Sequence, residues 1–237
     1  MQLEMARPDL LNLVIKQLNS FFCFYPKTER EILRKGFAAA LERTEYCFSK
    51  SENKYYIKNG ETYFNPFHSG QYSIFLYFLA NSIFSLYPDV TLLADRIYYL
   101  NKALNALDLF YEVKMPDIFF LDHPVGSVMG RATYGNFFSF AQCCTVGNNK
   151  GIYPTIGQNV KMMASSTILG NCGIGDNVII SAHSYVKDTD IPSCSIVFGI
   201  HPNLVIKTRD VSYFKRENSG RMQTAPNSSS GSDLFSL

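Results

Sequence analysis

Asp122 and His123 are the residues of this sequence whose types and spacing are best suited to chemistry. They lie in the stretch DIFFLDHPVGSVMG, residues 117–130, where bulky apolar residues give way to small residues and glycine. A histidine changes its charge near neutral pH and can move protons during catalysis. An Asp-His dipeptide is common, however, and a charged pair on a loop is the alternative. The pattern around the pair has to decide between the two.

The other histidines and the six cysteines point less clearly to a site. No two histidines have metal-ligand spacing, so we expect no metal. The cysteines lack CxxC spacing, and Cys143 and Cys144 are adjacent, which favours buried free thiols in a reducing cytoplasm. The net charge of +2 indicates neither a nucleic-acid partner nor an anionic membrane surface.

No segment predicts a transmembrane span or a cleaved signal peptide. The most apolar run, YSIFLYFLANSIFSLY, is too short for a bilayer and is interrupted by Asn81, which is typical of a core helix. The N-terminal residues lack a long apolar stretch of the signal-peptide type. We therefore expect a cytoplasmic protein.

The elements that position Asp122 and His123 differ between the two halves of the chain. In the first half, apolar residues at helical spacing predict four helices, all before residue 108. Thr28 and Glu31 fit a capping box at the start of the second helix. Asn59-Gly60 and Asn65-Pro66 signal turns before the third helix, around a short hairpin. The expected helices cover about residues 10–18, 28–48, 71–86 and 92–107.

In the second half a six-residue rhythm replaces the helical spacing. Small residues or glycine often follow the large apolar residue of each repeat, and small or aliphatic residues stand four positions after it. An antiparallel sandwich would instead show period-two alternation and hairpin turns. The repeat predicts a triangular solenoid in which three hexapeptides make one coil. The large residues form two series: Val128, Tyr134, Phe140 and Val146, then Ile156, Met162, Ile168, Ile174, Ile180 and Val186.

Four extra residues separate the two series, because Val146 and Ile156 stand ten apart rather than six. They belong to the segment NNKGIYP, residues 148–154. An insertion in a rigid prism must loop outward. Such a loop is either a place for substrate contacts or a tolerated surface insertion, and the sequence leaves both open.

Residues 70–208 resemble the serine acetyltransferases and related hexapeptide-repeat acyltransferases. The motif Leu121-Asp122-His123, an aspartate fifteen residues before the histidine, and the stretches FAQCCTVGN, ASSTILGN and FGIHPNLVIK carry the resemblance. It implies an α + β fold with a helical N-terminal domain over 1–107 and a left-handed parallel β-helix over 108–208. The polar, Ser/Asn/Gly-rich C-terminal extension over 209–237 predicts disorder from about residue 217.

The resemblance implies acetyl transfer from acetyl-CoA to an acceptor hydroxyl, without a metal. His123 would be the general base, and Asp108 would orient it. Asp122, Tyr153 and His68 would contact the acceptor, although a simple capping role for His68 is the alternative. No covalent acyl-enzyme is needed, because the thioester is already activated.

Acetyl-CoA would lie along the outside of the coils, between neighbouring subunits. The N–H of Gly147 would stabilise the oxyanion, and Ala164 and Ala182 would leave room for pantetheine. Lys207 and Arg209 would meet the 3′-phosphate. Small corner residues are also demanded by the fold itself. The flat prism faces imply a homotrimer or a dimer of trimers.

The outward loop departs from the pattern of serine acetyltransferases. Their loop ends in Arg-His-Pro, whereas this one ends in Ile152-Tyr153-Pro154. A tyrosine ring suits the apolar face of a sugar, so the main prediction is an acetyl-CoA-dependent O-acetyltransferase acting on a sugar or polysaccharide. The alternatives are a serine O-acetyltransferase, a transferase with another acceptor such as an amino sugar, and a non-catalytic β-helix scaffold.

Overall fold

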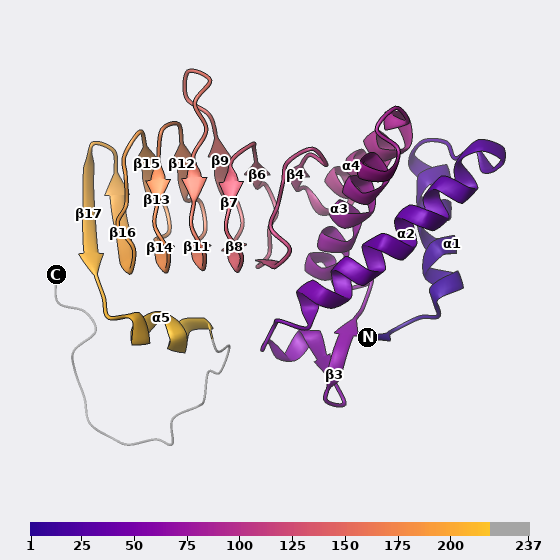
Figure 1. Cartoon of the computed structure of the whole chain (residues 1–237), viewed down its shortest axis with the longest axis horizontal. Coiled ribbons are helices and arrows are strands. Elements are labelled where there is room, and N and C mark those ends of the chain that lie inside the picture. Colours follow the sequence, from indigo (N-terminus) through magenta and orange to yellow (C-terminus); the bar gives the residue numbers. More distant parts are fainter. Residues whose placement is uncertain (219–237) are drawn as a thin grey trace.

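The first half of the chain folds into four helices, and α3 is the central one (Figure 1). Every residue of α3 from Gly70 to Ala80 is buried, with α2 and α4 packed against it. Its aromatic rings also contact Phe119 at the start of the second half, so α3 joins the two halves. The computed structural model describes residues 1–218 of the chain. The helices are α1 Arg7–Phe21, α2 Pro26–Phe48, α3 Ser69–Leu86 and α4 Thr91–Asn105.

The start of α2 differs from the predicted capping box. The helix begins at Pro26, and Glu29 rather than Glu31 reaches back, accepting a hydrogen bond of 2.9 Å from the N–H of Tyr25. Thr28 donates to the carbonyl of Tyr25 instead of accepting from the helix. The prediction was wrong because proline at the first helical position, which needs no N–H partner, starts the helix earlier.

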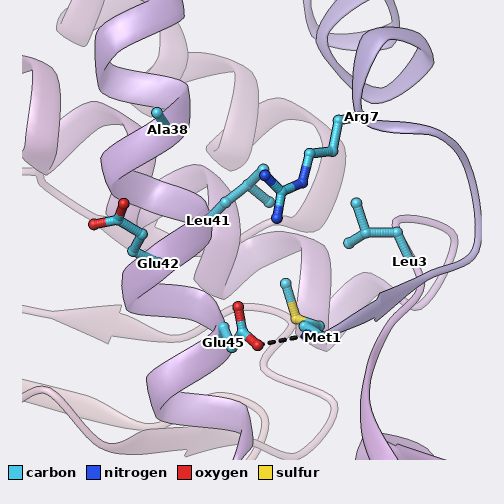
Figure 2. Close-up of a pocket in the computed structure, with 7 residues that line it drawn as sticks. All are labelled: Met1, Leu3, Arg7, Ala38, Leu41, Glu42 and Glu45. Carbon is cyan, nitrogen blue, oxygen red and sulfur yellow. Dashed lines mark hydrogen bonds and ion pairs between the residues drawn. The ribbon is translucent and has the colours of Figure 1, made fainter.

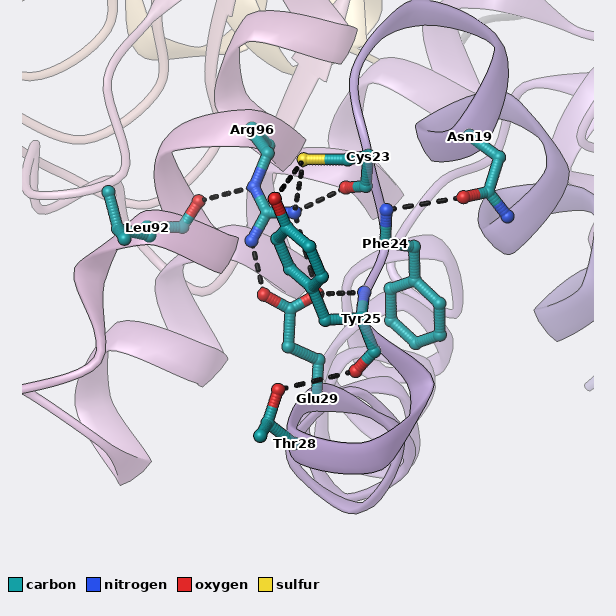
Figure 3. A network of polar contacts seen from close by, with 8 residues as sticks. All are labelled: Asn19, Cys23, Phe24, Tyr25, Thr28, Glu29, Leu92 and Arg96. Atoms are coloured by element: carbon teal, nitrogen blue, oxygen red, sulfur yellow. Dashed lines mark hydrogen bonds and ion pairs between the residues drawn. The ribbon is translucent and has the colours of Figure 1, made fainter.

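Arg96 of α4 ties the start of α2 to the rest of the helical domain (Figure 3). Its guanidinium pairs with Glu29 and also donates to the carbonyl of Cys23. The side chains of Arg96 and Glu29 are only 14% and 9% exposed. Removing one partner would leave a buried unpaired charge, which typically costs about 3–5 kcal/mol.

A cavity of about 130 Å³ lies between the N-terminal segment and α2 (Figure 2). The amino group of Met1 pairs with Glu45 at its edge, and Arg7 and Glu42 add two further charged side chains. This cavity belongs wholly to the helical domain, and none of its lining residues was predicted for a site.

A short hairpin forms at Asn59-Gly60, as the sequence predicts. Both residues have positive φ, 54° and 79°, which suits a tight two-residue turn. The hairpin follows the 3-10 helix η1, Lys54–Tyr56, and β1 adds to it in parallel. Its strands are β2 Ile57–Lys58 and β3 Glu61–Phe64, and β1 is Gln2–Leu3.

The second half forms a parallel β-helix whose short strands stack on three faces (Figure 1). The first face holds β4 Asp108–Leu109, β6 Val128–Met129, β9 Thr145–Gly147, β12 Thr167–Leu169 and β15 Tyr185–Lys187. The second face holds β7 Thr133–Tyr134, β10 Thr155–Ile156 and β13 Gly173–Ile174. The third face holds β5 Phe119–Leu121, β8 Phe138–Phe140, β11 Val160–Met162, β14 Val178–Ile180 and β16 Ser195–Ile200.

The β-helix ends in an antiparallel hairpin and a helix. Strand β17, Asn203–Thr208, pairs with β16, and α5, Val211–Asn218, follows it. The predicted fold class, a helical N-terminal region followed by a left-handed parallel β-helix, is confirmed. The prediction of disorder from about residue 217 falls mostly on residues 219–237, which lie outside the described residues.

The predicted inward series is confirmed except at its first member. Tyr134, Ile156 and Ile174 stack in register and are at most 7% exposed. Val128, in contrast, is 42% exposed, while Met129 is 2% exposed and pairs with Val146. The inward residue of the first coil is therefore Met129, one position later than the six-residue spacing predicts.

Among the helices of residues 1–218, none combines the length and the apolar character that crossing a bilayer needs. The cytoplasmic location stays a prediction.

Candidate active site

Asp122 and His123 lie on the corner that joins β5 to β6. This corner spans residues 122–127, whereas the corner above it, between β8 and β9, spans only 141–144. The chain returns by a tight turn in which the N–H of Val125 donates to the carbonyl of His123. The two extra residues place His123 outside the regular prism, where its side chain is 89% exposed.

The Asp122 carboxylate is the charge closest to the His123 ring among the described ion pairs. Asp122 Oδ1 lies 3.7 Å from His123 Nε2, and the Asp122 side chain is 75% exposed. This distance is too long for a hydrogen bond, so both side chains are free to change rotamer. The pair is accessible to a substrate and is not locked in one arrangement.

Asp108 lies beside the same corner, but its carboxylate contacts α4. Its oxygens accept hydrogen bonds of 2.6 Å from Tyr98 and from Lys102. Burial alone would raise the pKa of Asp108, but these two donors outweigh it and lower the pKa below its ordinary value. Within residues 1–218 no hydrogen bond joins Asp108 to His123. Each carboxylate oxygen can accept two hydrogen bonds, so each oxygen of Asp108 can still accept one more.

The backbone of Asp108 holds the corner in place. Its N–H donates to the carbonyl of Ser127 at 2.9 Å, and the N–H of Gly126 donates to the carbonyl of Ala106 at 2.9 Å. Gly126 has a φ of 76°, which a residue with a side chain rarely adopts. The segment around Asp108 is therefore fixed directly against the corner that carries His123.

His68 caps α3 and faces the same corner. Its Nδ1 accepts a hydrogen bond of 3.3 Å from the N–H of Gln71, so the ring proton of the neutral imidazole is on Nε2. Burial, followed by the charge of His123, lowers the pKa of His68. A Cβ added at Gly70 would lie 3.5 Å from the carbonyl of Leu121, which shows how closely α3 approaches the corner. The structure thus brings His68, Asp122 and His123 together.

The outward loop at residues 148–154 leaves the β-helix at a different edge (Figure 1). It connects β9 to β10, from the first face to the second, whereas the corner of His123 connects the third face to the first. Ile152 and Tyr153 are 50% and 44% exposed. Within one subunit the structure does not bring Tyr153 together with His123.

Ala164 and Ala182 lie on the corners stacked along the same edge as His123. The N–H of His183 donates to the carbonyl of Ala164, which aligns the two upper corners. Gly147 ends β9 at the opposite edge of the first face, so it does not join them within one subunit. Ala164 is half-buried and Ala182 is exposed.

Ala182 also lines a groove of about 330 Å³ on the third face, beside α5. Lys207 of β17 lies near its wall, with Nζ 5.6 Å from the ring centre of Phe198. Arg209 donates to the neighbouring carbonyl of Thr208. The sequence analysis predicted only Ala182 in this groove. Lys161 and Ile179 could also have been found, because each is the middle, outward-facing residue of its strand. The lining residues are Lys161, Met163, Ile179, Ser181, Ala182, Ile196, Phe198 and Tyr213.

No group of three His, Cys, Asp or Glu side chains in residues 1–218 is arranged to hold a metal ion. The predicted free thiols are all present, but Cys143 is exposed and Cys23 and Cys194 are partly exposed, so only three of the six are buried.

Comparison with known proteins identifies the repeat and relates the chain to acetyltransferases. The family model for the bacterial transferase hexapeptide (six repeats) matches residues 153–188. A serine acetyltransferase of Staphylococcus epidermidis RP62A is 32% identical over 144 residues, 58% of this chain and 66% of that protein. A serine acetyltransferase of Staphylococcus aureus Mu50 is 27% identical over 154 residues. The chain matches just under two thirds of the length of these relatives.

Solved structures share the fold. A serine acetyltransferase from Vibrio cholerae superposes with a TM-score of 0.66 at 20% identity, covering 86% of this chain and 80% of that one. A serine acetyltransferase in complex with CoA gives 0.62 at 18% identity, with 85% and 84% covered. These matches confirm the resemblance to hexapeptide-repeat acyltransferases of the serine acetyltransferase type.

Proposed function

We propose that this hexapeptide-repeat protein is an acetyl-CoA-dependent O-acetyltransferase, with serine as its best supported acceptor. The relatives found by sequence are named serine acetyltransferases, and a solved structure of one is a complex with CoA. This reverses the order of our predictions, in which a sugar acceptor came first. The single observation that carries the proposal is the enlarged corner, which exposes His123 beside Asp122 and His68.

His123 would act as the general base. Its free ring nitrogen would take the proton of the acceptor hydroxyl while the hydroxyl oxygen attacks the thioester carbon of acetyl-CoA. The resulting tetrahedral oxyanion would be stabilised by a backbone N–H, for which Gly147 is our candidate. When the intermediate collapses, the C–S bond breaks and the CoA thiolate takes the proton from the imidazolium. The product is the acetyl ester, and His123 returns to its neutral form.

Asp108 would orient His123 through the acceptor positions that Tyr98 and Lys102 leave free on its carboxylate. A carboxylate held in its charged form also stabilises the imidazolium that forms during the reaction. The two donors from α4 keep Asp108 charged and fix its direction. Asp108 would thus link α4 to the catalytic base, and the base would be held in a fixed orientation relative to that helix.

The donor would run along the edge that carries Ala164 and Ala182, toward His123. The groove beside Ala182 and the cation of Lys207 support this path for pantetheine and phosphate groups, with Arg209 as a second cation. Tyr153 and Gly147 lie at other edges of the prism, so a complete site would need a neighbouring subunit. We propose a homotrimer, or a dimer of trimers, with domains at 1–107 and 108–208.

A sugar acceptor remains the second candidate because Ile152 and Tyr153 are exposed on the loop. A tyrosine ring can stack on the apolar face of a pyranose. A thiol-release assay with acetyl-CoA and either L-serine or a nucleotide sugar separates the two. Turnover of serine supports the first candidate, and turnover of the sugar alone supports the second. If no thiol is released with L-serine or with the nucleotide sugar, the result counts against both candidates.

A further inference from the structure

The hydroxyl of Tyr56 is buried without a hydrogen-bond partner. Tyr56 ends η1, between α2 and the β2–β3 hairpin, and is 4% exposed. In the part of the chain that the structure describes, only one other buried side-chain oxygen or nitrogen lacks a partner, the hydroxyl of Ser73. An unpaired buried hydroxyl lowers stability, so its persistence calls for an explanation.

The ring of Tyr56 is clamped between the helical domain and the corner of the candidate site. Its centre lies 4.7 Å from that of Phe48, 5.7 Å from that of Phe120 and 6.2 Å from that of His68. Phe120 stands two residues before Asp122, and His68 caps the helix that packs over the corner. These contacts fix the phenol in place, so its hydroxyl is a donor at a set position beside the site.

Two groups act electrostatically on this hydroxyl, and only one is a free acceptor. Burial raises the pKa of Tyr56, and the neighbouring Cys47 and Asp122 raise it further, so the phenol keeps its proton. The thiol of Cys47 already donates to the carbonyl of Phe119 at 3.3 Å and is a weak acceptor. The carboxylate of Asp122 is exposed and makes no short contact with His123. Because the Phe120 ring packs on Tyr56 and Asp122 follows two residues later, we take the Asp122 carboxylate as the partner of this hydroxyl.

We propose that Tyr56 is a positioning residue for Asp122: when the acceptor binds, the Tyr56 hydroxyl donates to the Asp122 carboxylate and aims it at a cationic amine of the acceptor. This inference rests on the proposed function and deepens it, because it names a buried residue that positions Asp122 for an amine-bearing acceptor. A carboxylate that leaves water needs donors to replace its hydration. The phenol supplies one and the ammonium of the acceptor supplies the other.

A neutral sugar would leave this arrangement incomplete. Its hydroxyl groups carry no charge, so a carboxylate turned toward the protein would lose hydration without gaining an ion pair. Tyr56 is too buried to touch the acceptor itself, and its effect must pass through Asp122. The inference therefore predicts coupling between these two residues and none between Tyr56 and the donor groove.

The test is Tyr56→Phe, with kcat and KM measured for L-serine and for acetyl-CoA, together with the melting temperature. Losing one hydrogen bond to a charged group should raise the KM for serine about tenfold, with the KM for acetyl-CoA unchanged. The melting temperature should stay the same or rise, because an unpaired hydroxyl is removed. In an Asp122→Ala background, which removes the acceptor, the same substitution should have no further effect.

Ser73→Ala is the matched control, because it removes the other unpaired buried hydroxyl and should leave both KM values unchanged. An active wild-type enzyme whose KM for serine is unaffected by Tyr56→Phe would overturn the inference alone. So would an effect of full size in the Asp122→Ala background. Absence of acetyl transfer to serine by the wild-type enzyme would instead overturn the proposed acceptor, and the inference with it.

Discussion

The corner at residues 122–127 and the corner directly above it, at 141–144, connect the same two faces of the β-helix. The upper corner is the regular form, with Ala141 and Cys144 buried and Cys143 at a positive φ of 56°. The lower corner keeps only one buried end, Ser127, and adds two residues; Asp122 and His123 at its other end are exposed. The comparison suggests that the repeat supplies rigidity and that chemistry is placed where the repeat is interrupted.

The two corners should respond very differently to substitution at their exposed residues. His123→Ala removes the proposed base and should lower kcat by about a hundred- to ten-thousandfold, with little change in melting temperature. Cys143→Ser, on the regular corner, should leave kcat within about twofold, since surface changes of this kind are usually small. The measurement is the steady-state kcat of both variants. A His123→Ala enzyme with more than a tenth of wild-type turnover would contradict the role of His123 as the base.

Tyr153→Ala tests the second interruption of the repeat, the loop at 148–154. We expect weaker acceptor binding, by about tenfold in KM, with acetyl-CoA affinity nearly unchanged. Tyr153 and His123 lie at different edges of the prism, so a shared site takes them from different subunits. Mixing the Tyr153→Ala and His123→Ala proteins should therefore produce some intact sites and restore some activity. Failure of mixed oligomers to regain activity would show that the loop does not serve a neighbouring subunit.

Ala182→Leu tests whether the regular corners serve the donor. A longer side chain in the groove should raise the KM for acetyl-CoA about tenfold through steric overlap, with a smaller effect on the acceptor. The measurement is the KM for each substrate at saturation with the other. Equal affinity for acetyl-CoA in the variant would place the donor elsewhere.

Asp108→Asn should have a smaller effect on turnover than His123→Ala, because it misorients the base without removing it. It should also change the pH dependence of stability. The folded state lowers the pKa of Asp108 below 3.8, so its stabilising contribution is present above that pH and is lost as pH falls through the lowered value. Melting curves should therefore differ at pH 7 and converge in strong acid. A difference that persists unchanged at low pH would contradict this assignment.

The repeat could be predicted from the sequence because each coil requires the same pattern of large and small residues. From Tyr134 onward, one large residue per hexapeptide points inward, and this pattern is visible without tertiary contacts. The slip between Val128 and Met129 could not be seen, because the first coil takes its register from β4 and the helical domain below it. A local spacing rule carries no information about that contact.

The candidate site was predictable only where it coincides with a local motif. Asp122, His123 and Asp108 stand in short recognisable stretches, whereas the donors Tyr98 and Lys102 that hold Asp108 belong to α4 and meet it only after folding. Tyr56 gave no signal at all, since an aromatic residue after a polar stretch is ordinary. Its unpaired hydroxyl becomes evident only from packing against Phe48 and Phe120.

The most direct measurement is product analysis of the wild-type protein incubated with acetyl-CoA and L-serine. The account predicts that CoA and O-acetylserine form in equal amounts, and that His123→Ala abolishes both. Mass spectrometry of the product together with thiol release follows the two sides of the reaction. A wild-type protein that folds, binds acetyl-CoA and forms no O-acetylserine would contradict serine as the acceptor. Product formation that survives His123→Ala would contradict the enlarged corner as the site.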